Sequence, residues 1–433
     1  MTDTVAGAAG GGAEGANGAQ FKCKGAASSA LVNGDTDIAV SEDGFTLASL
    51  FDSTHVPWAD VTGLKFEDYT VQVQTKTGSY ALSKLGAAGE PLYAHMLSAY
   101  GGKVRKCLFV SGSPSVFAKG DVSIDGNVAH GVPVEVYDDC ILSLPADLSA
   151  RRAPLCFANG FKDEDFTLWI RTIDEKETTY SKLGYDHAPV SKAVQDAIKA
   201  LREKTIKQIT DLDPSLSDSA ATQLARLMPG GMAAPMGTVR GIAPSFANAL
   251  EAKLAKSRAA ETYKAFQEIS GADAVCVGFK ANDWGAGSGG GTAEAAGDTA
   301  TPQDQSQAQP PDPYMLWLVA PTPSLDACAV EFAGAESDAA ATFVYRFGGD
   351  WDGFRLKLGM ALEAIAFKRE IIRYTDEELE KPENSDFRMT NDRNEALRFV
   401  RGCFAGRAIH RSMDSWSAQL RDLLIIKEVD HDR

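Results

Sequence analysis

The sequence predicts an α+β protein built from repeated units, each of several antiparallel strands followed by one amphipathic helix. Two observations predict this fold class. Three strand-like segments, 69–86, 166–184 and 341–359, all close on Lys-Leu-Gly at nearly the same distance from a threonine. After each closing glycine, apolar residues recur at helical spacing, as Leu92 and Met96 do in the first copy. Self-similarity at a fixed distance indicates a repeat architecture.

Each of the three segments has the pattern of a β-hairpin. Val71 and Val73 alternate with glutamines in the first copy, which is typical of a half-buried antiparallel strand. Turn residues then precede a short second strand that returns to Lys-Leu-Gly. The corresponding apolar residues are Leu168 and Ile170, then Phe343, Tyr345 and Phe347, and the turns are 77–78, 174–176 and 348–353.

Further strand-like runs precede the first two hairpins. Together with the helices, these runs predict one repeat over 20–108 and a second over 109–203. A third, degenerate repeat is predicted over 271–375, where the early strands are fewer and interrupted. The runs are 21–32, 36–41, 44–51 and 61–66 in the first repeat, and 115–124, 133–136, 141–144 and 155–161 in the second.

The segments outside the repeats differ in composition. Gly/Ala-rich and Gln/Pro-rich stretches predict disorder, whereas helical spacing predicts a helical linker and a helical C-terminal region. The predicted regions are a disordered tail 1–19, a helical linker 204–270, a disordered insertion 285–312 within the third repeat, and a helical end 376–433 with helices at 391–411 and 414–428.

Within the helical linker, residues 228–244 form a Gly/Pro/Met-rich stretch that reads as a hinge. Met228, Met232 and Met236 could line an adaptable apolar groove, because methionine side chains are flexible. A loop packed on a neighbouring helix is the preferred interpretation.

Charge and cysteine usage limit the class of protein. The chain has 43 Lys+Arg against 59 Asp+Glu and a net charge of -16, which disfavours nucleic acid as a partner. Seven cysteines without a CxxC pair favour reduced thiols. The first residues lack the pattern of a signal peptide, and no apolar run approaches the ~20 residues that span a membrane. We therefore expect a cytoplasmic protein.

The sequence contains no motif that predicts catalysis, a cofactor or a metal ion. The six histidines form no HxH or HExxH pair, and no glycine-rich phosphate loop follows a strand. Acidic clusters at 138–139 and 163–165 could supply a general acid or hold a hard cation, but solvated turn residues explain them better. An enzyme whose site forms between repeats is the third hypothesis for function.

The layout of strands and helix resembles the pleckstrin-homology-like superfold. Residues 56–61, Val-Pro-Trp-Ala-Asp-Val, are also similar to the W-x-x-I/V segment of bacterial PH-like and GRAM-like modules. The resemblance covers 20–108 and 109–203 well and 271–375 less well. It implies a bent antiparallel sandwich or barrel closed by a C-terminal helix; an unrelated β-sandwich with a helix after each hairpin is the alternative.

The resemblance raises lipid binding as a function, which the charges disfavour. Phosphoinositide-binding PH domains use basic residues around the first strand pair, whereas residues 30–37 and 123–130 are acidic or neutral here. Basic residues cluster elsewhere, and they are the candidate residues for a GRAM-like membrane surface, the second hypothesis for function. These candidate binding residues are Lys103, Arg105 and Lys106, and Arg151 and Arg152.

The preferred hypothesis is a non-enzymatic protein-interaction or scaffold protein with a protein or peptide partner. PH-like modules can bind a peptide by adding a strand to a sheet edge or in the groove between the hairpin and the terminal helix. In the first repeat this groove is expected near a set of residues that ordinary core packing explains better. They are Val71, Val73, Leu92 and Met96.

Overall fold

The chain is α+β, with antiparallel sheets of six or seven strands and several helices, as the sequence predicts. The computed structural model describes residues 21–50, 52–281, 313–333 and 341–424. The tail predicted at 1–19 and the insertion predicted at 285–312 lie outside the described residues. Within the described residues, no helix is long and apolar enough to cross a bilayer.

Contacts divide the chain into two compact units. The first contains Met1–Ser111 together with Leu144–Ala150, and the second contains Gly112–Ser143 together with Arg151–Arg433. The first sheet belongs to the first unit, and the other two sheets belong to the second.

The first module consists of the first sheet and the helix that follows it. Its elements are β1 (Phe21–Ser28), β2 (Asn33–Val40), β3 (Gly44–Ala48), β4 (Ser53–Pro57), η1 (Trp58–Asp60), β5 (Val61–Glu67), β6 (Thr70–Thr75), β7 (Gly78–Ser83), η2 (Gly86–Ala88) and α1 (Gly89–Cys107). The strand order is β4-β3-β2-β1-β7-β6-β5, so β1 lies beside the last strand and β4 and β5 are the edges.

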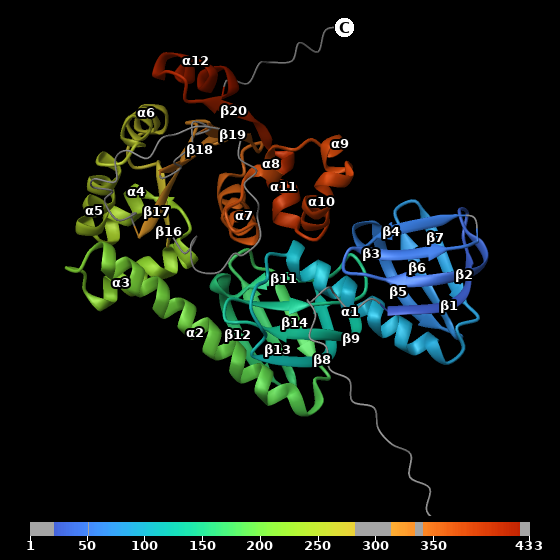
Figure 1. The fold of residues 1–433 in the computed structure, drawn as a ribbon. Coiled ribbons are helices and arrows are strands. Elements are labelled where there is room, and N and C mark those ends of the chain that lie inside the picture. Colours follow the sequence, from blue (N-terminus) through green and yellow to red (C-terminus); the bar gives the residue numbers. More distant parts are fainter. Residues whose placement is uncertain (1–20, 51, 282–312, 334–340, 425–433) are drawn as a thin grey trace, which may run out of the picture. The chain divides into compact units, whose positions relative to one another are not determined.

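The second module repeats this arrangement, and Figure 1 shows both sheets with their helices. Its elements are β8 (Val116–Ile124), β9 (Asn127–Val136), β10 (Cys140–Ser143), β11 (Arg151–Pro154), η3 (Leu155–Phe157), β12 (Ala158–Glu164), β13 (Thr167–Thr172), β14 (Glu177–Ser181), η4 (Gly184–Asp186) and α2 (His187–Leu212). The order is β11-β10-β9-β8-β14-β13-β12, which matches the first sheet strand for strand.

The two modules also agree in local backbone geometry. A two-residue turn with positive φ joins β5 to β6 at 68–69 and β12 to β13 at 165–166. Turns of this kind match the right-handed twist of a hairpin. β5 and β12 each carry a bulge, beside Gly63 and Gly160 respectively. Equivalent positions in the two modules can therefore be compared residue by residue.

The Lys-Leu-Gly motif has the same structural role in both modules. Leu85 and Leu183 are buried, and their side chains lie so close to Gly25 in β1 and Gly120 in β8 that a Cβ on either glycine would meet a leucine carbon at 2.7 Å. The closing glycines have φ of 53° and 60°, a left-handed conformation that favours glycine. The motif therefore closes the last strand onto the first and begins the helix.

The third sheet has a different strand order, β15-β16-β17-β18-β19-β20, in which consecutive strands are neighbours. Its strands are β15 (Ala234–Pro235), β16 (Cys276–Ala281), β17 (Tyr314–Pro321), β18 (Ala327–Ala333), β19 (Ala341–Arg346) and β20 (Phe404–Ile409). It does not repeat the order of the first two sheets.

The hairpin predicted to end at the third Lys-Leu-Gly is wrong. Residues 357–359 lie inside helix α7 (Trp351–Ala364), whose first turn is capped by the Asp350 carboxylate accepting a hydrogen bond from Gly353 N–H. Phe354 and Leu358 are both buried, and residues four apart share one face of a helix. The first predicted strand is present as β19, which contains Phe343 and Tyr345, whereas the predicted second strand is a helix.

The helix predicted over 391–411 is also wrong in part. Helix α11 (Glu395–Gly402) ends at Gly402, and the following residues form strand β20, which pairs with β19. The remaining helices are α3 (Asp218–Leu227), η5 (Pro229–Gly231), α4 (Met236–Ile242), α5 (Pro244–Ala255), α6 (Ala260–Ser270), α8 (Glu370–Arg373), α9 (Asp376–Leu379), η6 (Pro382–Asn384), α10 (Ser385–Asp392) and α12 (Met413–Leu424).

Candidate functional site

The basic residues near the end of α1 lie opposite an acidic loop. Lys103 Nζ lies 3.8 Å from Asp43 Oδ1, and Lys106 Nζ lies 3.6 Å from Glu42 Oε2. Arg105 lies between them on the same helix. Two of the three predicted binding cations in this cluster therefore have carboxylates beside them.

Arg151 and Arg152 form part of strand β11. The side chain of Arg152 is only 6% exposed, and its Nη2 lies 2.6 Å from Asp139 Oδ2. Its Nη1 also donates to the carbonyl oxygen of Glu363 at 3.5 Å. Arg152 is thus an internal ion-pair partner, and the structure does not bring these two arginines together with the α1 cluster in one compact unit.

The residues expected to mark a groove in the first module belong to its core. Val71 and Val73 in β6, and Leu92 and Met96 in α1, are each 0% exposed. The core-packing interpretation is therefore correct for all four. A groove does border α1, but it lies along β5, at the edge of the sheet.

In the first compact unit, this groove between β5 and α1, called the β5 groove, holds residues 144–150. Asp147 forms an antiparallel bridge with Gly63, and Leu64 N–H donates to the carbonyl oxygen of Ala146 at 2.9 Å. From the helix side, the Tyr100 hydroxyl donates to the carbonyl oxygen of Asp147 at 3.1 Å. The chain's own segment is therefore held against an edge strand by one backbone bridge and one backbone hydrogen bond, immediately before a turn at 148–149.

The ends of this bound segment are buried. Leu144 is 8% exposed and Ala150 is 1% exposed, whereas Leu148 between them is 39% exposed. The segment therefore combines backbone hydrogen bonds to the edge strand with anchoring side chains, which is how strand addition obtains affinity and specificity.

In the second module a groove between β12 and α2, called the β12 groove, lies beside the equivalent place. Gly160 and Phe161 of β12 take the positions that Gly63 and Leu64 have in β5. Among the described strands, β12 pairs with β13 alone and forms the edge of its sheet. The groove has a volume of about 540 Å³ and adjoins Gly160 and Phe161, which do not themselves line it; its lining includes Asp163, Asp165, Phe166, His187, Ser191 and Gln195.

A polar contact joins the strand to the helix in the β12 groove. The Ser191 hydroxyl donates to Asp163 Oδ2 at 2.5 Å, and His187 Nε2 lies 2.8 Å from Asp163 Oδ1. The hydrogen bonds from Ser191 and His187 hold the pKa of the Asp163 carboxyl below its ordinary value. Asp163 is therefore a carboxylate at neutral pH, fixed between β12 and the first turns of α2.

The first module has an aromatic contact at the same positions. Phe66, the counterpart of Asp163 in β5, stacks on Tyr93, the counterpart of Ser191 in the helix, with ring centroids 5.7 Å apart. Replacement of two aromatic residues by a carboxylate and a hydroxyl makes the β12 groove polar where the β5 groove is apolar. The two grooves thus share a backbone but differ in the side chains that a ligand would meet.

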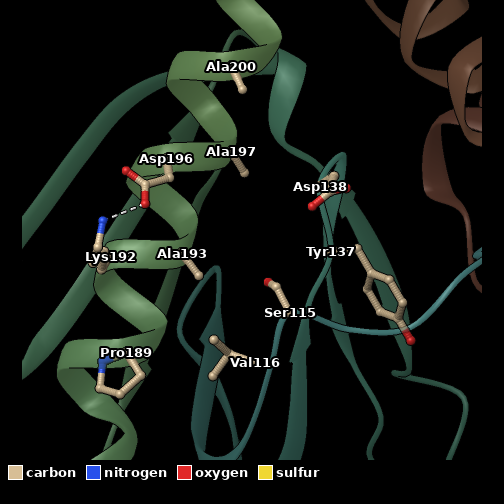
Figure 2. A pocket seen from close by; sticks show the side chains of 10 residues that line it. All are labelled: Ser115, Val116, Tyr137, Asp138, Pro189, Lys192, Ala193, Asp196, Ala197 and Ala200. Carbon is tan, nitrogen blue, oxygen red and sulfur yellow. Dashed lines mark hydrogen bonds and ion pairs between the residues drawn. The ribbon is translucent and has the colours of Figure 1, made fainter.

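A second groove lies along the other side of α2, and Figure 2 shows Ala193, Ala197 and Ala200 directed into it. This alanine groove has a volume of about 590 Å³ and also includes Val116, the first residue of β8. In the first module, the ring of Phe21, the first residue of β1, instead packs edge-on to His95 at 4.5 Å. Smaller side chains in the second module leave this space open.

The alanine groove lies beside an internal strand of its sheet. β8 pairs with β9 from Val116 onward and with β14 over Asp121–Ile124. The β12 groove instead lies beside an edge strand. We therefore take the β12 groove as the candidate functional site.

The described residues contain no group of three or more His, Cys, Asp or Glu side chains placed to hold a metal ion. Around Asp139, burial raises the pKa of the neighbouring Cys140 thiol to about 12, so this thiol stays protonated at neutral pH.

Comparison with models of known protein families gives no match, and no curated protein matches the chain significantly.

Proposed function

We propose that this chain is a non-enzymatic protein-interaction protein whose β12 groove binds an extended segment of a protein partner as an added strand. The supporting observation is the β5 groove, in which Ala146 and Asp147 contact the edge strand through Gly63 and Leu64, and the helix through Tyr100. The second module repeats the strand order and the bulge of the first. Its edge strand β12 therefore presents the same backbone geometry to a ligand as β5 does.

The physical basis is the unpaired edge of a strand. An edge strand presents N–H and C=O groups that lack partners, and an extended peptide satisfies them in a regular ladder. Leu64 N–H shows which backbone group points outward in the first module, and Phe161 N–H is its counterpart in the second. Strand addition would therefore begin at Phe161.

The two modules are best assigned to the pleckstrin-homology-like superfold. Support comes from the strand order, in which the first strand pairs with the last, and from the closing helix of each module. Trp58 of the W-x-x-V segment is fully buried, as expected for a structural residue of that segment. Since one superfold serves many functions, the function is argued from the groove and not from this assignment.

A protein partner agrees better with the charges than a membrane surface does. Arg152 is 6% exposed and paired with Asp139, and the α1 lysines lie beside carboxylates. A net charge of -16 opposes approach to anionic lipid and to nucleic acid alike. All seven cysteines are free thiols, which supports the proposal of a cytoplasmic protein.

The test is binding of a fluorescent peptide with the sequence of residues 142–150 to the full-length chain, followed by anisotropy. The chain's own segment is held in the β5 groove at an effective concentration on the order of millimolar, so peptide at lower concentration reports on the open groove. Ala188 is exposed and lines the β12 groove. Ala188→Trp is expected to fill the groove and to weaken binding about tenfold or more, since a bulky side chain excludes the peptide from its site.

The matched control is Ala200→Trp, which places the same side chain on the same helix but in the alanine groove. It is expected to leave the affinity unchanged. Absence of saturable binding, or loss of binding in Ala200→Trp with none in Ala188→Trp, would contradict the proposal.

A further inference from the structure

We infer that the segment bound by the β12 groove is basic, with lysine or arginine side chains near Asp163 and Asp165. This inference rests on the proposed function and adds the chemical class of the partner. Three observations lead to it. They are the register of the segment bound in the β5 groove, the polar residues that replace aromatic ones in the β12 groove, and the exposed carboxylates that line the β12 groove.

The register of residues 144–150 shows which ligand position meets each groove residue. Asp147 is bridged to Gly63 and Ala146 accepts from Leu64, so continuing this antiparallel register sets Leu144 opposite Phe66. Directly opposed residues on an antiparallel pair have their side chains on the same face. Leu144 is apolar and buried, which agrees with the apolar side chain of Phe66 at that position.

The same register applied to the second module changes the requirement. A ligand whose residue opposes Gly160 as Asp147 opposes Gly63 would set its third preceding residue opposite Asp163. Residues before it would pass Asp165, in the turn that follows β12. An apolar side chain opposite the Asp163 carboxylate would leave that charge partly desolvated, whereas an ammonium or guanidinium group would pair with it. At the ligand position that Leu144 has in the β5 groove, we therefore expect a basic residue in a ligand of the β12 groove.

The electrostatics of the β12 groove agree with a basic ligand. Its lining contains Asp163, Asp165 and Asp196. Asp163 lies beside His187, and the one lysine, Lys192, has its Nζ 2.7 Å from Asp196 Oδ2, so Asp165 is the carboxylate most open to a ligand. No ion pair of the Asp165 carboxylate is found within the described residues. Phe166, next to Asp165, is 80% exposed, and an exposed ring beside a carboxylate is a favourable place for a cation.

The inference is tested with three peptides and the full-length chain. One has the sequence of residues 142–150, the second carries Leu142→Lys and Leu144→Lys, and the third carries Leu142→Glu and Leu144→Glu. The lysine peptide is expected to bind about tenfold tighter than the glutamate peptide at low salt, since two partly exposed charge pairs are made in one case and two repulsions in the other. The difference is expected to shrink at about 0.5 M NaCl because of screening.

Two variants assign the preference to the groove. Asp165→Asn removes one carboxylate and keeps a residue that tolerates the φ of 50° found there, so it is expected to reduce the lysine-to-glutamate ratio. Glu203→Gln, which neutralises an exposed carboxylate of α2 outside the groove lining, is the matched control and is expected to leave the ratio unchanged.

The outcomes separate this inference from the proposed function. Equal affinity for the three peptides, tighter binding of the glutamate peptide, or a ratio that Asp165→Asn does not change would overturn the basic-ligand inference while leaving strand addition intact. Failure of every peptide to bind would overturn both. A lysine preference that Asp165→Asn weakens and Glu203→Gln preserves supports the inference.

Discussion

Gly231→Ala is expected to destabilise the second compact unit by about 4 kcal/mol or more. Gly231 is buried in the linker between α3 and α4, and its φ of 82° is unfavourable for any residue with a Cβ. A Cβ there would also lie 1.8 Å from the carbonyl oxygen of Phe279, in strand β16. Because β16 is paired with β15 and β17, that carbonyl cannot move without disrupting the sheet. Chemical denaturation followed by circular dichroism measures the loss.

The control for this prediction is Gly241→Ala in α4, where nothing lies within 4 Å of the new Cβ. Alanine has the higher helix propensity, so this variant should change the free energy of unfolding by no more than about 1 kcal/mol, toward greater stability. If Gly231→Ala unfolded at the same denaturant concentration as Gly241→Ala, the close packing of this segment on β16 would be incorrect.

Trp58→Ala is expected to cost the first compact unit about 3–5 kcal/mol, the range for removal of a large core side chain. Trp58 is 0% exposed, its indole N–H donates to the carbonyl oxygen of Ser41 at 3.0 Å, and its ring lies 6.2 Å from that of Tyr100. Tyr100 in turn holds Asp147 in the β5 groove. We therefore expect the variant to loosen residues 144–150 as well, which limited proteolysis can detect.

Leu50→Ala serves as the comparison, since Leu50 is 92% exposed in the same compact unit. Its effect on the unfolding free energy should stay within about 0.5 kcal/mol. Equal effects of the two substitutions would refute a core position for Trp58.

Features that depend on neighbours along the chain could be predicted from the sequence. Period-2 alternation at Val71 and Val73, followed by helical spacing after Gly86, predicts a hairpin and helix that the structure contains. Strands β4 and β11 were missed because they are short and end in proline, at Pro57 and Pro154, which weakens the strand pattern.

Where tertiary contacts decide the structure, the sequence patterns were misleading. Leu358 of the third Lys-Leu-Gly is compatible with either a strand or a helix, and the Asp350 cap together with burial of Phe354 selects the helix. The stretch 228–244 reads as a hinge by composition. In the structure Met228, Met232 and Met236 are all buried, and Gly231 is locked against β16.

The candidate site depends on contacts between residues far apart in sequence. Nothing local indicates that residues 144–150 lie on β5, because Gly63 and Asp147 are brought together only by the fold. One signal was present in the repeat itself. When the two copies are aligned, Phe66 of the first corresponds to Asp163 of the second, and Tyr93 corresponds to Ser191. Residues that only packed in a core would be expected to stay apolar in both copies.

The most direct test of strand addition at β12 is NMR-detected hydrogen exchange of the Phe161 amide, with and without the lysine peptide. Leu64 N–H, its counterpart, already donates to Ala146 and should exchange slowly in the free chain, which provides an internal reference. We expect exchange at Phe161 to be fast without peptide and to slow toward the rate of Leu64 when peptide is bound. Binding that leaves exchange at Phe161 unchanged, or that protects amides only around the alanine groove, would contradict the account.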